Sequence, residues 1–192
     1  MRIRLFIVVA FMLVSGRVSA QAVQTPAPAT TNPLSTHTKV LHFGVRAVVL
    51  RAAELMPESA YSFRPVATVR TFGQLVGHIA DSQYLFCSGA LGEQESAHRV
   101  EQTVTTKAGL IAALRQAYGY CDRAYGMLND ANAAQIVSSR GVPTARMNAL
   151  GSNEVHTTLH YGNIVTYLRM NGITPPSTDL EWARQLRPVQ RP

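Results

Sequence analysis

The chain has 192 residues, of which 46% are hydrophobic and 15% are charged, and its formal net charge at pH 7 is +7. This length suits one domain with a hydrophobic core of its own and is too short to suggest two. The basic residues are scattered along the chain except for a small group near its C-terminal end, so they do not form the basic footprint that nucleic-acid binding requires.

The first twenty residues have the composition of a secretory signal peptide. MRIR is basic, LFIVVAFMLV is apolar, and SGRVSA ends in small residues. The apolar run is shorter than the roughly 20 residues that span a bilayer. Cleavage after Ala20 would remove three arginines and no acid, which lowers the net charge from +7 to +4. We therefore expect an exported protein, periplasmic or extracellular, with no stable membrane insertion after cleavage; an uncleaved N-terminal anchor is the alternative.

The next segment, residues 21–33, reads QAVQTPAPATTNP and has the composition of an extended linker. Apolar residues at helical spacing then predict a first helix from Leu34 to Met56, which Pro57 ends. Residues 57–70 show no sustained period and are expected to form a loop. The apolar stripe of this first helix consists of Leu41, Val45, Val48, Ala52 and Leu55.

A second helix is expected to begin at TFGQ, where Thr71 and Gln74 have the spacing of a capping box. It should end near Gly89 to Gly92, and the polar residues 92–104 should form a linker. A third helix is predicted from about Thr106 to Leu128.

Residues 129–143 are expected to form a loop, after which Thr144 would cap a fourth helix from Ala145 to about Met170. Leu159 is one of the apolar residues assigned to the buried face of that helix. Asn171 and the glycine and prolines that follow should end it. Residues 179–192 should form a C-terminal tail, in which residues 179–186 could form one more short helix.

Strand signals are almost absent from the chain, because no segment alternates apolar and polar residues over a sustained length. Four amphipathic helices in one domain must bury their apolar stripes against one another. The predicted fold is therefore all-α, a four-helix bundle over residues 34–178.

The two cysteines, Cys87 and Cys121, leave two possibilities open, a disulfide or a pair of buried free thiols. They lie at similar depths in the second and third helices. Antiparallel helices would place them several turns apart, whereas parallel helices would bring them level, within the roughly 7 Å between Cα atoms that a disulfide tolerates. A disulfide would therefore indicate a bundle with a crossover connection, and we favour that arrangement.

HTTLHYGNIVTYLRMNG places His156 and His160 four residues apart, so both can face the same side of a helix. That spacing permits a metal site without demanding one. A third ligand would have to come from another helix, and His78 is the best candidate because it follows Gly77, where a neighbouring segment could approach closely. His37 and His98 are expected to face solvent. His42 could line the bundle or face water.

Two segments, FRPVATVRTFGQLVGHIAD and HTTLHYGNIVTYLRMNGITPPST, resemble the DinB/YfiT-like metalloenzyme family, in particular its secreted members. The resemblance covers about residues 34–178. It implies a four-helix bundle with a three-histidine metal centre, in which His78, His156 and His160 would hold a divalent ion, with zinc or nickel the first expectation. Some relatives are metal-dependent transferases that attach low-molecular-weight thiols to electrophiles.

Three functions are compatible with these features. The first is a metal-dependent transferase or hydrolase acting on a small molecule, with Asp81 either orienting an imidazole, serving as a base or simply exposed. The second is a non-catalytic module that binds a metal or a small ligand, and the third is a structural protein. Reduced thiols belong to the cytosol, which makes the transferase less natural for an exported chain. A homodimer is an open alternative for assembly.

Overall fold

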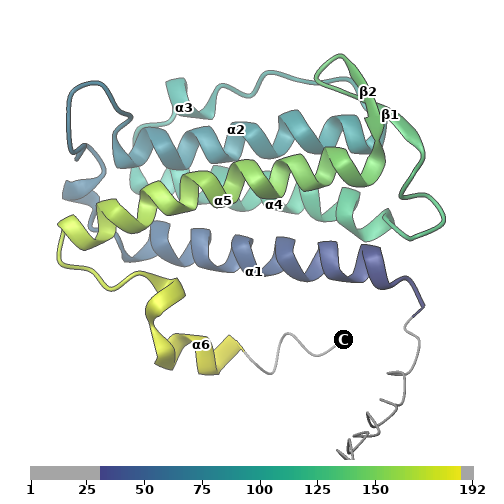
Figure 1. Ribbon diagram of the computed structural model, residues 1–192. Coiled ribbons are helices and arrows are strands. Elements are labelled where there is room, and N and C mark those ends of the chain that lie inside the picture. The colour runs from purple at the N-terminus through teal and green to yellow at the C-terminus, as the bar shows by residue number, and fades with distance from the viewer. Residues whose placement is uncertain (1–30, 187–192) are drawn as a thin grey trace, which may run out of the picture.

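The computed structural model describes residues 31–186. The predicted signal peptide, residues 21–30 of the linker and residues 187–192 of the tail lie outside this range. The fold is an all-α four-helix bundle, as predicted (Figure 1). Its long helices are α1 (Pro33–Leu55), α2 (Phe72–Leu91), α4 (Lys107–Met127) and α5 (Arg146–Met170). The shorter elements are η1 (Glu58–Ala60), α3 (Val100–Thr103), β1 (Ile136–Ser139), β2 (Val142–Ala145), η2 (Pro176–Thr178) and α6 (Leu180–Leu186).

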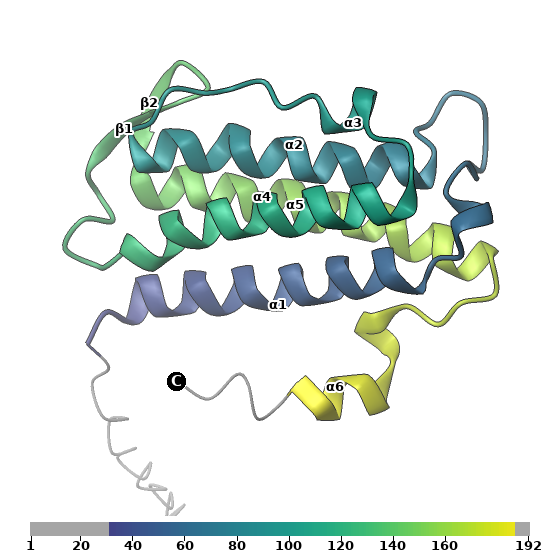
Figure 2. The ribbon, with the colours of Figure 1, turned by 180° about the vertical axis from the view of Figure 1, so that it is seen from behind.

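The connection between α2 and α4 is a crossover. In Figures 1 and 2, α2 and α4 run in the same direction, and the segment between them returns along α2 before α4 begins. Helix α2 packs against α4 and α5, and α1 packs against the same two helices from the other side. Cys87 of α2 and Cys121 of α4 form a disulfide, with their Cα atoms 5.3 Å apart. Level cysteines on parallel helices are what the crossover arrangement predicted.

The core lies between the four long helices and is continuous from α1 to α5. Val49, Phe72, Ile79, Leu114 and Leu168 are each completely buried and belong to one cluster. A second cluster surrounds the disulfide at the other end of the bundle. Within residues 31–186, none of the helices combines the length and the apolar character that a membrane crossing needs.

The start of α2 has the capping box expected from the sequence. The Thr71 hydroxyl accepts a hydrogen bond from the Gln74 amide at 3.2 Å, and the Thr71 amide donates to Gln74 Oε1 at 2.9 Å. Two free amides of the first turn are thereby satisfied. This cap fixes where α2 begins, and so fixes the height at which His78 stands in the bundle.

The region before α5 differs from the prediction. Instead of a loop, β1 and β2 form an antiparallel hairpin in which Thr144 pairs with Val137. Thr144 is therefore a strand residue and not the helix cap, which is Ala145. The hairpin turn places Arg140 at φ 54° and Gly141 at φ 75°. Turns with two positive φ values usually carry Asn-Gly or Asp-Gly, so arginine in the first position hid the signal.

Two leucines assigned to buried stripes are exposed. Leu159 of α5 is 64% exposed and Leu41 of α1 is 47% exposed. The reason is that both helices bury polar residues on their inner faces: α5 buries Asn153, Glu154 and Thr157, and α1 buries Ser35 and His42. A hydrophobic pattern cannot locate a face that buries polar groups.

Candidate metal centre

Three histidines from two helices converge at one point. His78 comes from α2, and His156 and His160 lie one turn apart on α5. The Nε2 atom of His156 lies 3.2 Å from the Nε2 of His78 and 3.2 Å from the Nε2 of His160. One ligand atom from each of the three histidines lies within 4.8 Å of the other two. The histidines that the sequence singled out are thus brought together, although 78 residues separate His78 from His156.

The donor set fits a divalent metal ion. At a zinc–nitrogen distance of about 2.0–2.1 Å, two tetrahedral ligand atoms stand about 3.3 Å apart. The observed separations of 3.2 Å match this spacing. All three side chains are half-buried, so an ion held here would keep access to the solvent side for a further ligand. Three imidazoles suit zinc, nickel, iron and copper alike, and the geometry does not choose among these metals.

Glu101 of α3 orients His78. Its Oε2 lies 3.0 Å from Nδ1 of His78, and its Oε1 accepts a hydrogen bond from Nε of Arg70 at 2.8 Å. A carboxylate at Nδ1 keeps the proton on that nitrogen and leaves the Nε2 lone pair for a metal. Glu101 lies in the segment expected to be an unstructured polar linker, where no periodic pattern marked it.

The position of Glu101 depends on two residues of α2. The Asp81 carboxylate accepts hydrogen bonds from the amides of Val100 at 2.8 Å and of Glu101 at 3.0 Å, and so caps α3. Gly77 lets α3 approach, because a Cβ there would stand 2.7 Å from the Cα of Glu101. Asp81 therefore holds the backbone of α3, and contacts neither an imidazole nor the point where the three rings meet. Gly77 was the one sequence signal that a segment would lie against α2 here.

The environment keeps the three imidazoles neutral. Burial, followed by the neighbouring histidines and by the charges of Arg140 and Arg70, lowers the pKa of His156 to about 4. Burial, the charge of His78 and the charge of Arg70 lower the pKa of His160 to about 4. Burial and Arg70 also lower the pKa of His78, although Glu101 opposes them. Neutral imidazole is the form that binds a metal, so all three are prepared for ligation at neutral pH.

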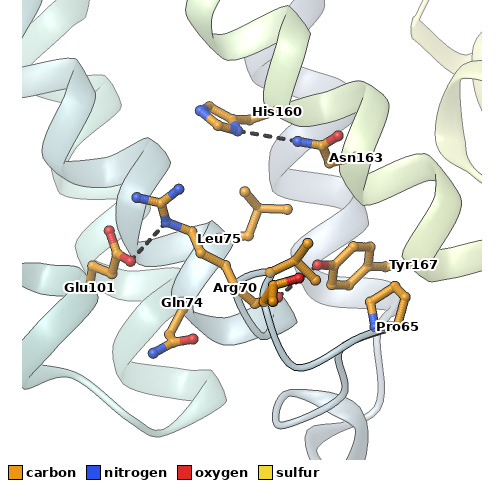
Figure 3. A pocket seen from close by; sticks show the side chains of 10 residues that line it. Pro65, Arg70, Gln74, Leu75, Glu101, His160, Asn163 and Tyr167 are labelled. Atoms are coloured by element: carbon orange, nitrogen blue, oxygen red, sulfur yellow. Dashed lines mark hydrogen bonds and ion pairs between the residues drawn. The ribbon is translucent and has the colours of Figure 1, made fainter.

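A pocket of about 570 Å³ opens beside His160 (Figure 3). The loop before α2 and the last turns of α5 form its walls, and the guanidinium of Arg70 extends between Glu101 and His160. The Asn163 amide lies 3.5 Å from Nδ1 of His160. The lining residues are Pro65, Thr68, Val69, Arg70, Gln74, Leu75, Glu101, His160, Asn163 and Tyr167.

The other histidines lie away from this centre. His37 and His98 are exposed, as expected, and His98 stacks on the ring of Tyr84. His42 is almost completely buried inside the bundle, between the carboxylates of Asp122 and Glu154. Of the two alternatives for His42, the structure shows the interior one. Both of its ring nitrogens are engaged by carboxylates, so it has no lone pair to offer a metal.

Comparisons with known proteins agree with this fold. A family model described as the DinB superfamily matches residues 44–164. A DinB-like protein from Bacillus cereus ATCC 10987 is similar in structure, with a TM-score of 0.60 at 17% identity, over 69% of this chain and 89% of that one. A DinB-like protein from Bacillus subtilis gives 0.59 at 21% identity, covering 71% and 94%. A conserved protein from Enterococcus faecalis gives 0.59 at 13% identity, covering 73% and 97%. A search of curated protein sequences found no match.

Proposed function

Because the chain belongs to the DinB superfamily, we propose that it is a metal-dependent transferase or hydrolase acting on a small molecule, with a divalent ion held by His78, His156 and His160. The observation that carries the proposal is the convergence of three Nε2 atoms, with separations of 3.2 Å on either side of His156. Zinc and nickel are the metals we favour, because both accept an all-imidazole donor set.

The charge of the site suits such chemistry. Three neutral imidazoles leave the positive charge of a bound divalent ion uncompensated, so the ion supplies a Lewis acid for a substrate, a thiol or water. His78 is held in register by Glu101, and the Nδ1 of His160 faces Asn163. The pocket beside His160 provides space for a small molecule next to the ion.

We also propose that the protein is exported to the periplasm or beyond. The support comes from the composition of the first twenty residues and from the Cys87–Cys121 disulfide, a bond that persists in oxidising compartments. Export disfavours a reduced thiol cosubstrate, and so favours the hydrolase over the transferase.

A second candidate is a module of the same fold that binds a metal or a small ligand without turning it over. One observation favours it. The two carboxylates nearest the triad are already engaged, since Asp81 caps α3 and Glu101 bridges Arg70 and His78. Neither is an unengaged base, so catalysis would depend on the ion and its bound ligands alone.

Elemental analysis of the natively exported, mature protein tests the metal centre. We expect a divalent metal in the wild type and its loss in His78→Ala and His160→Ala, whereas His37→Ala, which removes an exposed histidine from α1, should keep it. Zinc added at about 100 times its dissociation constant should stabilise the wild type by roughly 2.7 kcal/mol and the two ligand variants by much less. Wild-type protein that carries no metal and gains no stability from zinc, nickel or manganese would refute the centre.

Turnover separates the enzyme from the binding module. A panel of esters and of thiol–electrophile pairs should show a metal-dependent rate that His160→Ala abolishes. A rate equal to that of buffer across the panel, in protein whose metal content has been measured, would leave the binding module as the function.

A further inference from the structure

Arg70 is held in place from two directions beside the triad. Its Nε donates to Glu101 at 2.8 Å, and its backbone carbonyl accepts a hydrogen bond from the Tyr167 hydroxyl at 2.7 Å. The Tyr167 contact fixes the backbone of Arg70, and the Glu101 contact restrains its guanidinium, so part of the rotamer freedom that ligand binding would cost is already lost. Arg70 is therefore partly preorganised for a ligand.

The ends of the Arg70 guanidinium remain available. Among residues 31–186, no group accepts a hydrogen bond from its two Nη atoms, and the side chain is 42% exposed. Figure 3 shows these nitrogens directed toward the space between Glu101 and His160. Two parallel N–H donors in a fork match a carboxylate.

The rest of the pocket has both apolar and polar lining. Pro65, Val69 and Leu75 provide its apolar surface, here called the apolar wall, and the polar side chains of Gln74 and Asn163 also line it. The volume of about 570 Å³ is within the range that small-molecule sites occupy. An inorganic anion would leave the apolar wall uncovered, whereas an organic anion would cover it.

We propose that this pocket binds a small organic carboxylate, whose carboxylate group pairs with the Nη atoms of Arg70 and whose apolar body lies against Pro65, Val69 and Leu75. The inference rests on the proposed function, because it places the substrate of the metal centre in this pocket. It assigns Arg70 as the residue that selects an anionic ligand. Glu101 does not neutralise Arg70 alone, because the same carboxylate also contacts His78.

Hexanoate, hexanamide and inorganic phosphate are suitable probes, with binding measured by calorimetry on the mature protein both free of metal and loaded with zinc. Hexanoate should bind and hexanamide, its uncharged counterpart, should bind at least about tenfold more weakly, as expected for loss of a charge-assisted pair. Phosphate should bind more weakly than hexanoate because it cannot use the apolar wall.

The chain offers a matched control for Arg70. Arg115 is also an exposed arginine paired with a glutamate, donating to Glu54 at 2.7 Å, and it lies outside the pocket. Arg70→Gln should weaken hexanoate binding about tenfold or more, and Arg70→Lys should weaken it less because the charge remains. Arg115→Gln should leave binding within about twofold of the wild type, since exposed pairs contribute little.

The outcomes separate this inference from the proposed function, because zinc content is measured in the same samples. Zinc uptake together with equal binding of hexanoate and hexanamide, or with unchanged hexanoate binding in folded Arg70→Gln, overturns the carboxylate site and leaves the metal centre standing. Phosphate binding as tight as hexanoate binding overturns it in favour of an inorganic anion site. Protein that takes up no zinc overturns the metal centre and this inference together.

Discussion

Two sites in the bundle that contain histidine differ in their electrostatics. One is the His42 cluster, in which His42 contacts Asp122 and Glu154, and the other is the cluster of His78, His156 and His160. Burial acts to lower the pKa of His42, but its hydrogen bonds to Asp122 and Glu154 and the negative charges of these residues outweigh burial and raise that pKa. At the metal centre, burial and nearby positive charge lower the pKa of His156 and His160 to about 4. The same imidazole side chain is thus a structural cation at His42, whereas in the triad it is neutral and able to bind a metal.

What separates the clusters is how many ring nitrogens have an acidic partner. His42 has a carboxylate at each nitrogen, at 3.1 Å for Nδ1 and 3.0 Å for Nε2. Only imidazolium can donate from both nitrogens. His78 has one carboxylate, at Nδ1, so its Nε2 keeps a lone pair directed toward the other imidazoles. A histidine on a helix facing the core is therefore identified as a ligand by its unpaired nitrogen, not by its burial.

The His42 cluster is part of a larger polar network. Tyr125 stacks on the His42 ring at 3.8 Å between centroids and donates to Glu154 at 2.6 Å, while Arg46 pairs with Asp122. Two cations and two carboxylates balance one another along α1, α4 and α5. Buried charges remain tolerable when each is paired and hydrogen-bonded in this way.

The largest effect should come from breaking the His42 cluster. His42→Ala would leave the buried Glu154 carboxylate without its cation, and removing one partner of a buried pair costs about 3–5 kcal/mol. Urea unfolding of metal-free protein measures this loss. The matched control is His37→Ala on the same helix, whose exposed side chain should change the free energy of unfolding by less than about 0.5 kcal/mol.

His42→Ala should leave zinc affinity close to that of the wild type under conditions where the variant is folded, because no atom of His42 contacts the triad within residues 31–186. If His42→Ala and His37→Ala destabilise the protein equally, His42 is not the cation that balances the network. If zinc affinity falls with His42→Ala, the two clusters are coupled and the contrast between them fails.

The second effect tests how closely α3 must approach the metal centre. Gly77→Ala would place a Cβ 2.7 Å from the Cα of Glu101 and 2.9 Å from its backbone nitrogen, so α3 must shift. Overpacking of this kind costs about 1–3 kcal/mol. Displacing the carboxylate from His78 should also weaken zinc binding about 10- to 100-fold, as loss of such partners does. Calorimetric titration of zinc into both proteins measures the second effect.

Gly44 is the counterpart of Gly77 beside the other cluster. It lies two residues after His42 in α1, and a Cβ there would meet nothing within 4 Å. Gly44→Ala should therefore stabilise the protein by about 0.4–1 kcal/mol and leave zinc binding unchanged. Equal effects of Gly44→Ala and Gly77→Ala would show that α3 does not need its close packing on α2.

The convergence of the three histidines could be predicted from the sequence, whereas the residues that support them could not. His156 and His160 share one face of one helix, which spacing alone reveals. The capping box at Thr71 set the height of His78 correctly. The role of Glu101 was not predicted, because Glu101 lies in a helix of only four residues within a polar linker, and so short a helix shows no hydrophobic period. Short elements held by tertiary contacts leave little trace in local sequence.

The fold followed a similar division. The four long helices were predicted within one or two residues of their observed bounds, because capping residues, glycines and prolines mark their ends. The hairpin was missed because each strand has only four residues and its turn begins with Arg140. Leu159 was wrongly assigned to the core. The buried face of α5 carries polar residues such as Glu154, so it is not the face that its apolar residues mark.

The last effect concerns pH, and the two clusters should respond with opposite signs. His156 and His160 have folded pKa values of about 4, below the value of 6.5 for a free histidine. Between those values the unfolded chain binds more protons, so their contribution is complete above pH 6.5 and is lost as the pH falls toward 4. His42 has a raised pKa, so its contribution is complete below pH 6.5 and is lost as the pH rises through that raised value.

Between pH 7 and pH 5.5, each of His156 and His160 should lower the free energy of unfolding of metal-free protein by about 1 kcal/mol. Urea unfolding with a chelator present should accordingly show a smaller loss for His156→Ala than for the wild type over this interval, since the variant shares every other titrating group. Parallel stability curves for the two proteins would mean that His156 titrates in the folded protein as it does in the unfolded chain. Burial and nearby positive charge would then not be what keeps the imidazoles of the triad neutral.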